Sequence, residues 1–235
     1  MTTFVLVHGA WHGGWCWVRV ADRLRAAGHS VFTPTLSGLA DRSHLLAPTI
    51  SLQTHIKDVA NLLHWEELAD VVLVGHSYGG MVITGAADRV ADRVRTLVYV
   101  DAFTPKHGQS AFDLRTPEAN AMVKDKARTF GGGWRIPPTP AAAFNVNSAD
   151  RAWVDAKCTD LPIGCFSEAL HITGAVDRIA DRAYVRATGF ANPTFDKALA
   201  DARDDSRFRC YEVDCGHDVM VDAPDELTRI LLEGA

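Results

Sequence analysis

The sequence predicts an α/β fold, with a mostly parallel sheet of about six strands and helices on both faces. Short apolar runs alternate with segments of helical periodicity, which is the pattern of βαβ units. The 235 residues, 47% hydrophobic and 23% charged, are ordinary for one globular domain. The strands are predicted over 4–7, 31–35, 71–75, 96–101, 183–188 and 208–213.

Helices are predicted between these runs. After the first strand, apolar residues recur at i, i+3, i+4 and i+7 and end at a glycine suited to the C′ position: Trp17, Val20, Ala21, Leu24 and Gly28. A second helix over about 52–67 has one apolar face, and the last helix is predicted to begin with Asp222 as its N-cap and Pro224 in its first turn.

Residues 104–180 interrupt the alternation. This stretch is rich in proline, contains three consecutive glycines at 131–133, and allows short helices over 116–128, 139–144, 148–156 and 166–171. We expect one domain spanning 1–235, in which 104–180 forms a helical cap over the carboxyl edge of the sheet, where ligands bind in open α/β folds.

Charge and cysteine content indicate which binding partners and which cellular compartment to expect. A net charge of −5 gives no reason to expect nucleic acid or an anionic membrane surface. Five cysteines without C-x-x-C spacing suit a reducing compartment and predict a cytoplasmic location. The chain opens directly into a strand and has no apolar run of 18 residues, so neither a signal segment nor a membrane span is expected. A homodimer is left open.

Residues 75–79, Gly-His-Ser-Tyr-Gly, fit G-x-S-x-G between an apolar strand and a helix. In this elbow the nucleophilic serine, here Ser77, takes a strained conformation, and a Cβ at Gly75 or Gly79 would crowd the turn. The amide of Tyr78 would then lie at a helix N-terminus, where it can meet developing negative charge.

Two further segments complete a catalytic pattern. The glycine-rich loop 8–15 after the first strand can bring the Ala10 amide toward the serine as a second oxyanion donor. The loop lacks the lysine and hydroxyl of a phosphate-binding P-loop. His217 follows the last strand and is the favoured base, since it comes last in the order serine, acid, histidine.

The other histidines are assigned structural roles. His8 and His76 stand at strand ends, where packing and backbone hydrogen bonds are expected, and His107 and His171 fall in the cap. The remaining five are interpreted as loop or helix-surface residues: His12, His29, His44, His55 and His64.

The segments 8–17, 75–80 and 216–220 together resemble the α/β-hydrolase superfamily. More narrowly, they resemble the branch that holds plant methyl esterases, hydroxynitrile lyases and their bacterial esterase relatives. The resemblance covers nearly the whole chain and is weak through the cap. It implies catalytic roles for Ser77 and His217 and oxyanion-donor roles for the amides of Ala10 and Tyr78.

The third member of the triad departs from the plant pattern, which places the acid after the strand that follows the cap. Here that strand leads into Phe190-Ala191-Asn192-Pro193, without a carboxylate. Asp101, at the end of the strand before the cap, is the favoured acid because a triad needs a group that orients the histidine. Asp196 is the reserve.

Lyases of this branch carry threonine and lysine at the positions of Ala10 and Asp218. An aspartate would repel departing cyanide, so hydrolysis is favoured over lyase chemistry. The alternatives are a hydroxynitrile lyase, a cofactor-free oxygenase or C–C-cleaving enzyme on the same scaffold, or a non-catalytic ligand-binding relative.

The predicted reaction is hydrolysis of a small, hydrophobic or aromatic carboxylic ester or lactone through an acyl-enzyme, with neither metal nor cofactor. Aromatic residues of the first loop and the cap are expected to line an apolar pocket: Trp11, Phe103, Trp134 and Trp153.

Overall fold

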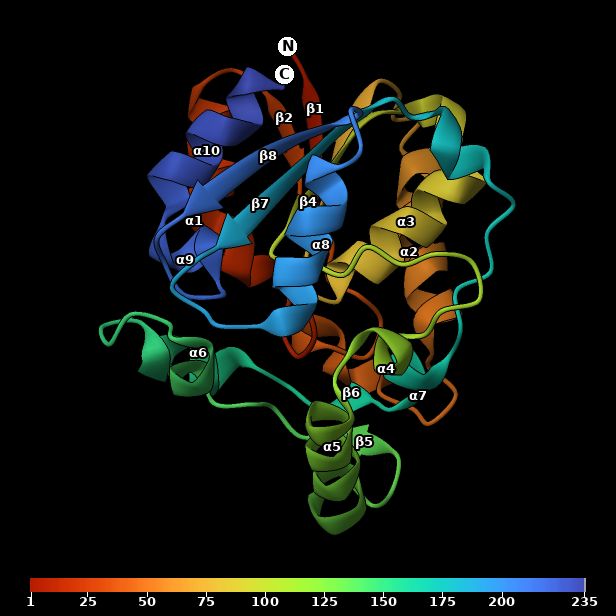
Figure 1. The fold of residues 1–235 in the computed structure, drawn as a ribbon, viewed down its shortest axis with the longest axis vertical. Helices are drawn as coiled ribbons and strands as arrows, with labels where there is room; N and C mark the ends of the chain where they lie inside the picture. The colour runs from red at the N-terminus through yellow and green to blue at the C-terminus, as the bar shows by residue number, and fades with distance from the viewer. Residues whose placement is uncertain (235) are drawn as a thin grey trace.

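The central sheet has six strands in the order β2-β1-β3-β4-β7-β8, and every pairing is parallel (Figure 1). The computed structural model describes residues 1–234. The prediction of a mostly parallel sheet of about six strands is confirmed. The strands are β1 (Thr3–Val7), β2 (Ser30–Phe32), β3 (Val71–His76), β4 (Val94–Val100), β7 (Asp181–Ala187) and β8 (Phe208–Val213).

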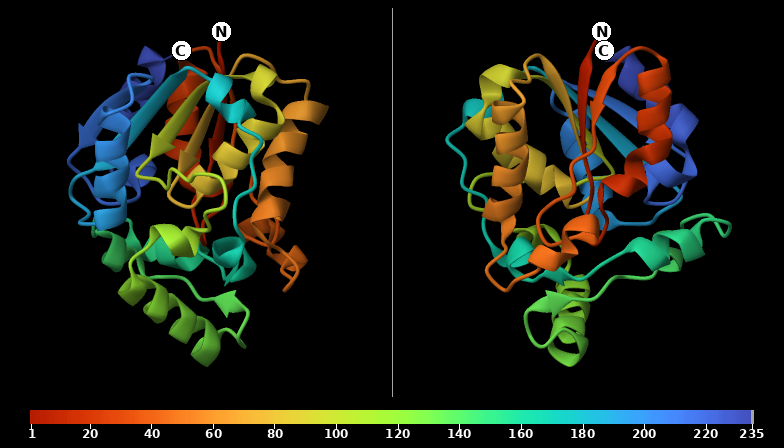
Figure 2. Two further views of the ribbon diagram at one scale, coloured as in Figure 1. Left: turned by 45° about the vertical axis from the view of Figure 1, so that its right-hand side comes forward. Right: turned by 180° about the vertical axis from the view of Figure 1, so that it is seen from behind.

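The sheet is buried on both faces, as a parallel sheet requires. Successive residues of β1 point to opposite sides, with Phe4 and Leu6 in one core and Val5 and Val7 in the other. Helices α1, α9 and α10 pack on the first side, and α2, α3 and α8 on the second (Figure 2). Their bounds are α1 (Val18–Ala26), α2 (Leu52–Trp65), α3 (Gly79–Arg89), α8 (Pro193–Arg203), α9 (Val219–Asp222) and α10 (Pro224–Glu233).

The sequence predicted the residues at two helix ends, Gly28 after α1 and Asp222 before α10. Gly28 lies just past the end of α1 with a φ of 86°, which confirms its C′ role. The prediction for Asp222 is wrong, because this residue ends α9 and Ala223 is the N-cap of α10. The Asp222 carboxylate instead accepts hydrogen bonds from the amides of Gly216 (3.2 Å) and Asn147 (3.1 Å) and so fixes two loops.

The segment between β4 and β7 lies at the carboxyl edge of the sheet, opposite the chain termini (Figure 1). Helix α5 projects from the body of the molecule, and a two-stranded antiparallel ribbon, β5–β6, lies beside its base. The regular elements of this segment are α4 (Ala111–Leu114), α5 (Pro117–Phe130), β5 (Arg135–Ile136), α6 (Arg151–Lys157), β6 (Leu161–Pro162) and α7 (Gly164–Ser167).

The strand order creates a crevice at this edge. The connection that leaves β1 leads to β2 on one side of it, whereas the connection that leaves β3 leads to β4 on the opposite side. The two connections therefore run in opposite directions from neighbouring strands. Ligands bind at such a switch point in open α/β sheets. None of the helices in residues 1–234 is long and apolar enough to cross a membrane.

Candidate active site

Ser77 follows β3 in a sharp turn that leads into α3. Its φ of 53° lies in the left-handed region, and its amide donates to the carbonyl of Val100 (3.2 Å). A Cβ at Gly75 would lie 2.7 Å from the Gly79 carbonyl oxygen, and a Cβ at Gly79 would lie 2.8 Å from that of Val7. The turn therefore requires both glycines, and it holds Ser77 in a strained, partly exposed position.

His217 and Asp101 meet across the sheet edge. The Nδ1 atom of His217 lies 2.6 Å from Oδ2 of Asp101, and both side chains are buried. Asp101 directly follows β4 and has a φ of 43°, so its backbone is also in the left-handed region. With Nδ1 donating to the carboxylate, Nε2 of the neutral imidazole is left as an acceptor.

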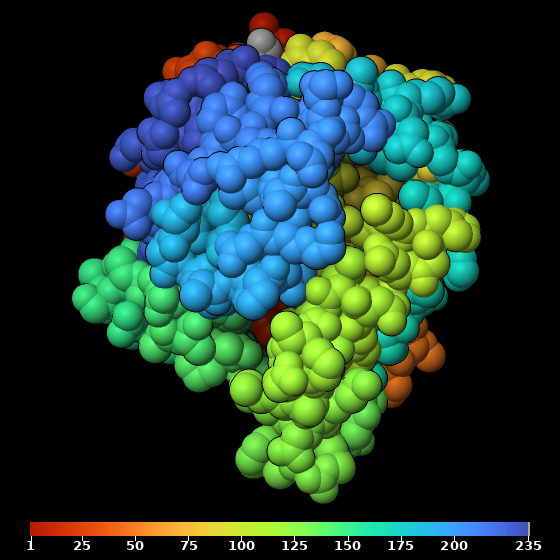
Figure 3. Space-filling model, viewed as in Figure 1, coloured from red at the N-terminus to blue at the C-terminus, as the bar shows by residue number. Residues whose placement is uncertain are grey.

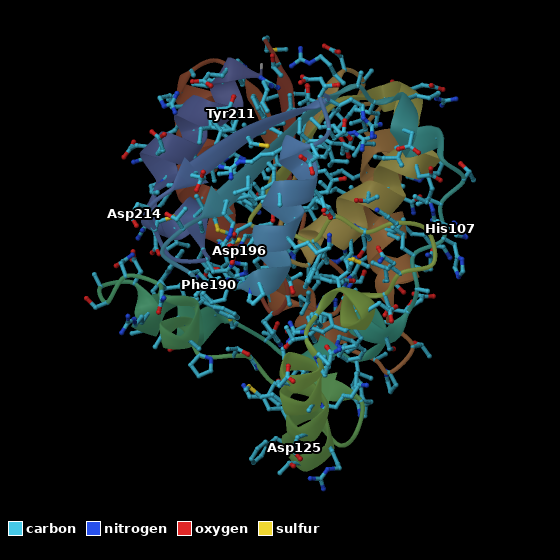
Figure 4. The ribbon with its side chains drawn as sticks, viewed as in Figure 1. His107, Asp125, Phe190, Asp196, Tyr211 and Asp214 are labelled. Carbon is cyan, nitrogen blue, oxygen red and sulfur yellow. The ribbon has the colours of Figure 1, made fainter. Side chains whose placement is uncertain are left out.

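Aromatic rings enclose the imidazole of His217, which is only 3% exposed. Phe195 stacks on it at 5.3 Å between ring centroids, and Phe190 and Phe144 lie at 4.9 and 5.2 Å. Phe190 belongs to the loop between β7 and α8, which faces the cap segment (Figure 4). These rings exclude water from the His217–Asp101 pair, and so strengthen its electrostatic interaction.

A buried arginine of β7 holds the other oxygen of Asp101. Nη1 of Arg186 lies 2.7 Å from Oδ1 of Asp101, and the Ala187 amide donates to the same oxygen (3.2 Å). Arg186 also donates to the carbonyls of Ala187 and Phe190. Burial by itself lowers the pKa of Arg186, but the Asp101 charge raises it above the ordinary value. Sequence reasoning did not identify Arg186, because nothing in the strand pattern marks it as inward-facing.

Asp196 lies on the far side of that arginine. Its Oδ1 accepts from Nε and Nη2 of Arg186 at 2.9 and 2.7 Å, and its side chain is 63% exposed. Figure 4 shows Asp196 on α8, above the loop of Phe190. Asp196 is therefore linked to Asp101 through Arg186, whereas Asp101 contacts the imidazole directly.

Ala10 and Tyr78, the two predicted oxyanion donors, lie in the loops that follow β1 and β3. Within residues 1–234, neither amide donates a hydrogen bond to a backbone or side-chain acceptor. Both residues are buried, and buried amides are rarely left unpaired. The Tyr78 hydroxyl lies 3.1 Å from Nδ1 of His55, away from the amide.

His12 and Asp218 form a buried ion pair behind the crevice. Nδ1 of His12 lies 2.8 Å from the Ala10 carbonyl oxygen, and its Nε2 lies 3.0 Å from Oδ2 of Asp218. Since both ring nitrogens face acceptors, both carry protons and the ring is an imidazolium. Burial alone would lower the pKa of His12, but Asp218 raises it above 6.5, and His12 in turn lowers the pKa of Asp218 despite burial.

Burial changes the interpretation of two histidines and of Asp218. His55 lies on α2 but is buried, with its Nε2 2.9 Å from the Ser37 carbonyl oxygen, so its assignment to a helix surface is wrong. His12 lies in the loop after β1, as expected, but it too is buried. Asp218 was expected to repel departing cyanide, but it does not belong to the pocket lining, and His12 largely compensates its charge. His12 and Asp218 are 206 positions apart, so no local sequence pattern indicates their contact.

His8 and His76 have the structural roles expected of them. His8 Nε2 accepts from the Leu36 amide (3.0 Å), and burial lowers the pKa of His8 to about 3. His76 Nε2 lies 3.0 Å from the His217 carbonyl oxygen, and burial and the His217 ring lower the pKa of His76 well below 6.5.

One group of residues in the described chain has the composition of a metal site. Atoms of His76, His217 and Asp218 lie within 4.8 Å of one another. However, the His217 carbonyl engages His76, Asp101 engages His217, and His12 engages Asp218. A cation there would also face the imidazolium of His12. The donor set therefore does not fit a metal ion, and we assign no metal role to it.

A pocket of about 290 Å³ joins the sheet edge to the cap segment. Its lining includes Ser77, His217 and Ala10, together with Trp11 and Phe103. The space-filling view is hollowed here, and atoms from the start of the chain, in dark red, are visible between the cap and the segment before α8 (Figure 3). The structure places Trp134 and Trp153 outside this lining: Trp153 packs on Trp15 at 4.9 Å, and Trp134 lies beside Arg135.

The model of the alpha/beta hydrolase family matches residues 4–230, and the chain belongs to that family. Over 242 residues the chain is 43% identical to the carbendazim hydrolyzing esterase of Nocardioides sp. (strain SG-4G), a match that covers 98% of each chain. It is 29% identical to methylesterase 10 of Arabidopsis thaliana over 167 residues, which are 68% of this chain and 60% of that protein.

Solved structures show the same fold. An extracellular alpha/beta-hydrolase from a Paenibacillus species superposes with a TM-score of 0.85 at 24% identity, covering 99% of this chain and 98% of that one. A methylesterase from Arabidopsis superposes with a TM-score of 0.77 at 21% identity, covering 100% and 98%. The α/β-hydrolase fold predicted from the sequence is thus confirmed over nearly the whole chain.

Proposed function

We propose that Ser77, His217 and Asp101 form the triad with which this carboxylic ester hydrolase makes and breaks an acyl-enzyme. His217 takes the Ser77 proton through Nε2, Oγ attacks the ester carbonyl, and the amides of Ala10 and Tyr78 receive the oxyanion. His217 then protonates the leaving alcohol and later activates water for deacylation. The scheme calls for no metal or cofactor.

The 2.6 Å contact between His217 Nδ1 and Asp101 Oδ2 carries this proposal. It supplies what a triad needs, namely an acid that selects the tautomer and stabilises the imidazolium. The unpaired amides of Ala10 and Tyr78 support it independently, because oxyanion donors must be free to bind the reacting oxygen. Asp101 is therefore preferred to Asp196 as the acid.

The aromatic lining of the pocket supports a small hydrophobic or aromatic ester as substrate. Six rings besides His217 belong to this lining: Trp11, Phe103, Phe144, Phe166, Phe190 and Phe195. Among the relatives, one is named for carbendazim hydrolysis and others are methylesterases, so carbendazim and methyl esters of aromatic acids belong in the first substrate panel.

Assembly, location and the role of the cap segment are further proposals. We propose a reducing, cytoplasmic compartment, because five cysteines, an odd number without C-x-x-C spacing, do not suggest a disulfide framework. We also propose that residues 104–180 act as the cap of a single domain and that the enzyme is a monomer or a homodimer. Sedimentation and thiol titration of the native protein test assembly and redox state.

The test of the triad uses Ser77→Ala with Ser43→Ala as the matched control, since Ser43 is exposed and lies outside the pocket. Wild type and the control should hydrolyse aromatic methyl esters, show an acyl-enzyme burst, and take up a serine-directed fluorophosphonate probe. Ser77→Ala should lose all three. Hydrolysis that survives in Ser77→Ala, or labelling elsewhere in the chain, would exclude Ser77 as the nucleophile.

A further inference from the structure

The pocket beside Ser77 contains two cationic side chains and no acidic one. Arg115 and Lys126 belong to its lining, and within residues 1–234 no Asp or Glu does. The protein as a whole has a net charge of −5, so this concentration of positive charge is local to the pocket. A cleft lined by one sign of charge attracts ligands of the opposite sign.

Arg115 is half-buried without a carboxylate partner. Its Nε donates to the side-chain oxygen of Asn120 and its Nη2 to the Ala119 carbonyl, both at 3.2 Å. The two fully buried arginines of residues 1–234, Arg182 and Arg186, each contact a carboxylate. Burial accordingly lowers the pKa of Arg115. A half-buried guanidinium that is bonded only to neutral groups retains capacity to bind an anion.

Lys126 lies in the same lining on α5. Its Nζ is 3.5 Å from the hydroxyl oxygen of Thr139, a neutral partner at the limit of hydrogen bonding. Arg128, two residues further along the same helix, instead pairs with Asp125 at 2.5 Å. Lys126 thus contributes a second unpaired cation to the pocket.

Arg115 lies one aromatic ring away from the reaction centre. Its guanidinium carbon is 5.4 Å from the centroid of the Phe166 ring. The Phe166 ring in turn lies 6.1 Å from Trp11 and 5.7 Å from Tyr78, the residues that follow the oxyanion donor Ala10 and the nucleophile. Aromatic side chains therefore line the part of the pocket that lies between Arg115 and Ser77.

We infer that Arg115 is the centre of an anion subsite, to which Lys126 adds positive charge from the same lining, and that the preferred substrates are esters of aromatic acids bearing a second, free carboxylate. The inference rests on the proposed ester hydrolysis and assigns its substrate class. The ester group reaches Ser77, the ring packs against Phe166, and the carboxylate accepts hydrogen bonds from Arg115. A guanidinium binds a carboxylate through two parallel hydrogen bonds, which a neutral amide cannot replace.

Two nearly isosteric pairs of esters test the charge preference: monomethyl terephthalate against methyl 4-carbamoylbenzoate, and their meta isomers. Binding to Ser77→Ala, measured by calorimetry, is independent of hydrolysis, and turnover is measured with otherwise wild-type enzyme. We expect the carboxylate member of at least one pair to be favoured by about tenfold to a hundredfold, as for hydrogen bonds to charged groups. The preference should weaken as salt is raised.

Arg115→Met should bring that ratio close to one, Arg115→Lys should keep part of it, and Lys126→Gln should reduce it. Arg128→Gln is the matched control, because it removes a cation from α5 outside the lining and should leave the ratio unchanged. If Arg115→Met does not fold, Arg115→Lys and the wild-type ligand pairs still decide the question.

Equal or tighter binding of both carbamoyl esters would overturn the subsite. So would a ratio that Arg115→Met and Arg115→Lys leave unchanged. Selective binding of the carboxylate by Ser77→Ala, without hydrolysis of any ester by wild type, would contradict the proposed function and uphold the anion subsite. Hydrolysis with no preference for the carboxylate would uphold the proposed function and contradict the anion subsite.

Discussion

Four hydrogen bonds hold Asp101 in place. One oxygen accepts from His217, the other accepts from Arg186 and from the Ala187 amide, and its own amide donates to the Val185 carbonyl at 2.6 Å. Its left-handed backbone, with a φ of 43°, is a conformation that persists only where the surroundings impose it. Such constraint suits a residue whose work is to orient another.

Replacing Asp101 by Asn should lower kcat by roughly three to four orders of magnitude, because an amide cannot select the required imidazole tautomer. The measurement is steady-state hydrolysis of an aromatic methyl ester, with circular dichroism to show that the fold persists. Asp196→Asn is the matched control, since it removes the carboxylate on the other side of Arg186. We expect the control to lose less than about tenfold; the reverse order of the two losses would reassign the acid to Asp196.

At the scale of elements, the carboxyl ends of β3, β4, β7 and β8 act together. β3 leads into Ser77, β4 into Asp101 and β8 into the loop of His217, while β7 supplies Arg186 from within the strand. The parallel register brings these ends to one edge although the residues are far apart in sequence. Arg186 joins β7 to the end of β4 and to the loop that begins α8.

Arg186→Met should therefore act as the loss of a positioning residue. It leaves Asp101 with one buried oxygen lacking its charged partner, so both kcat and the free energy of unfolding should fall. Arg186→Lys should restore part of kcat.

The split between kcat and KM distinguishes positioning from mere support. A positioning role predicts that Arg186→Met lowers kcat while KM for an aromatic methyl ester stays within about threefold, because Arg186 does not line the pocket. Arg186→Lys should then recover kcat without changing KM. Loss of folded protein with unchanged kcat per folded molecule would indicate a structural role alone.

At the scale of the whole molecule, buried histidines govern stability near neutral pH. Burial lowers the pKa of His8 to about 3, and it lowers those of His55 and His76, whereas Asp218 raises that of His12 above 6.5. Below 6.5 the unfolded chain binds protons at the first three that the folded chain does not. Above 6.5 the folded chain retains a proton on His12 that the unfolded chain loses.

The free energy of unfolding should accordingly rise from pH 5 toward neutrality, by up to about 1.4 kcal/mol per pH unit for each proton involved. Above pH 6.5 the proton that folded His12 retains should oppose this rise. Urea unfolding of wild type and His12→Gln at pH 5, 6.5 and 8 measures both effects. His12→Gln should be destabilised at pH 6.5, because Asp218 loses its buried partner, and should gain more stability than wild type between pH 6.5 and 8. Equal changes in the two proteins between pH 6.5 and 8 would contradict the imidazolium assigned to His12.

The fold was predictable because its signals are local. Apolar runs and helical periodicity reflect burial within single elements, and G-x-S-x-G reflects the close contacts at Gly75 and Gly79. Segment ends were less predictable: the strand predicted over 31–35 spans Ser30–Phe32, and Asp222 binds neighbouring loops instead of capping α10. Those outcomes depend on partners that are distant in the sequence.

By itself the sequence determined the parallel α/β architecture and its family, since strand pattern, glycines and motif order are constraints within short segments. It also indicated which residues to examine at the carboxyl edge of the sheet. Only the tertiary structure decided that His217 faces Asp101, that Arg186 separates Asp101 from Asp196, and that His12 neutralises Asp218. Ion pairs and hydrogen bonds between separate strands and loops depend on where the packed sheet brings those side chains, and no local pattern encodes that distance.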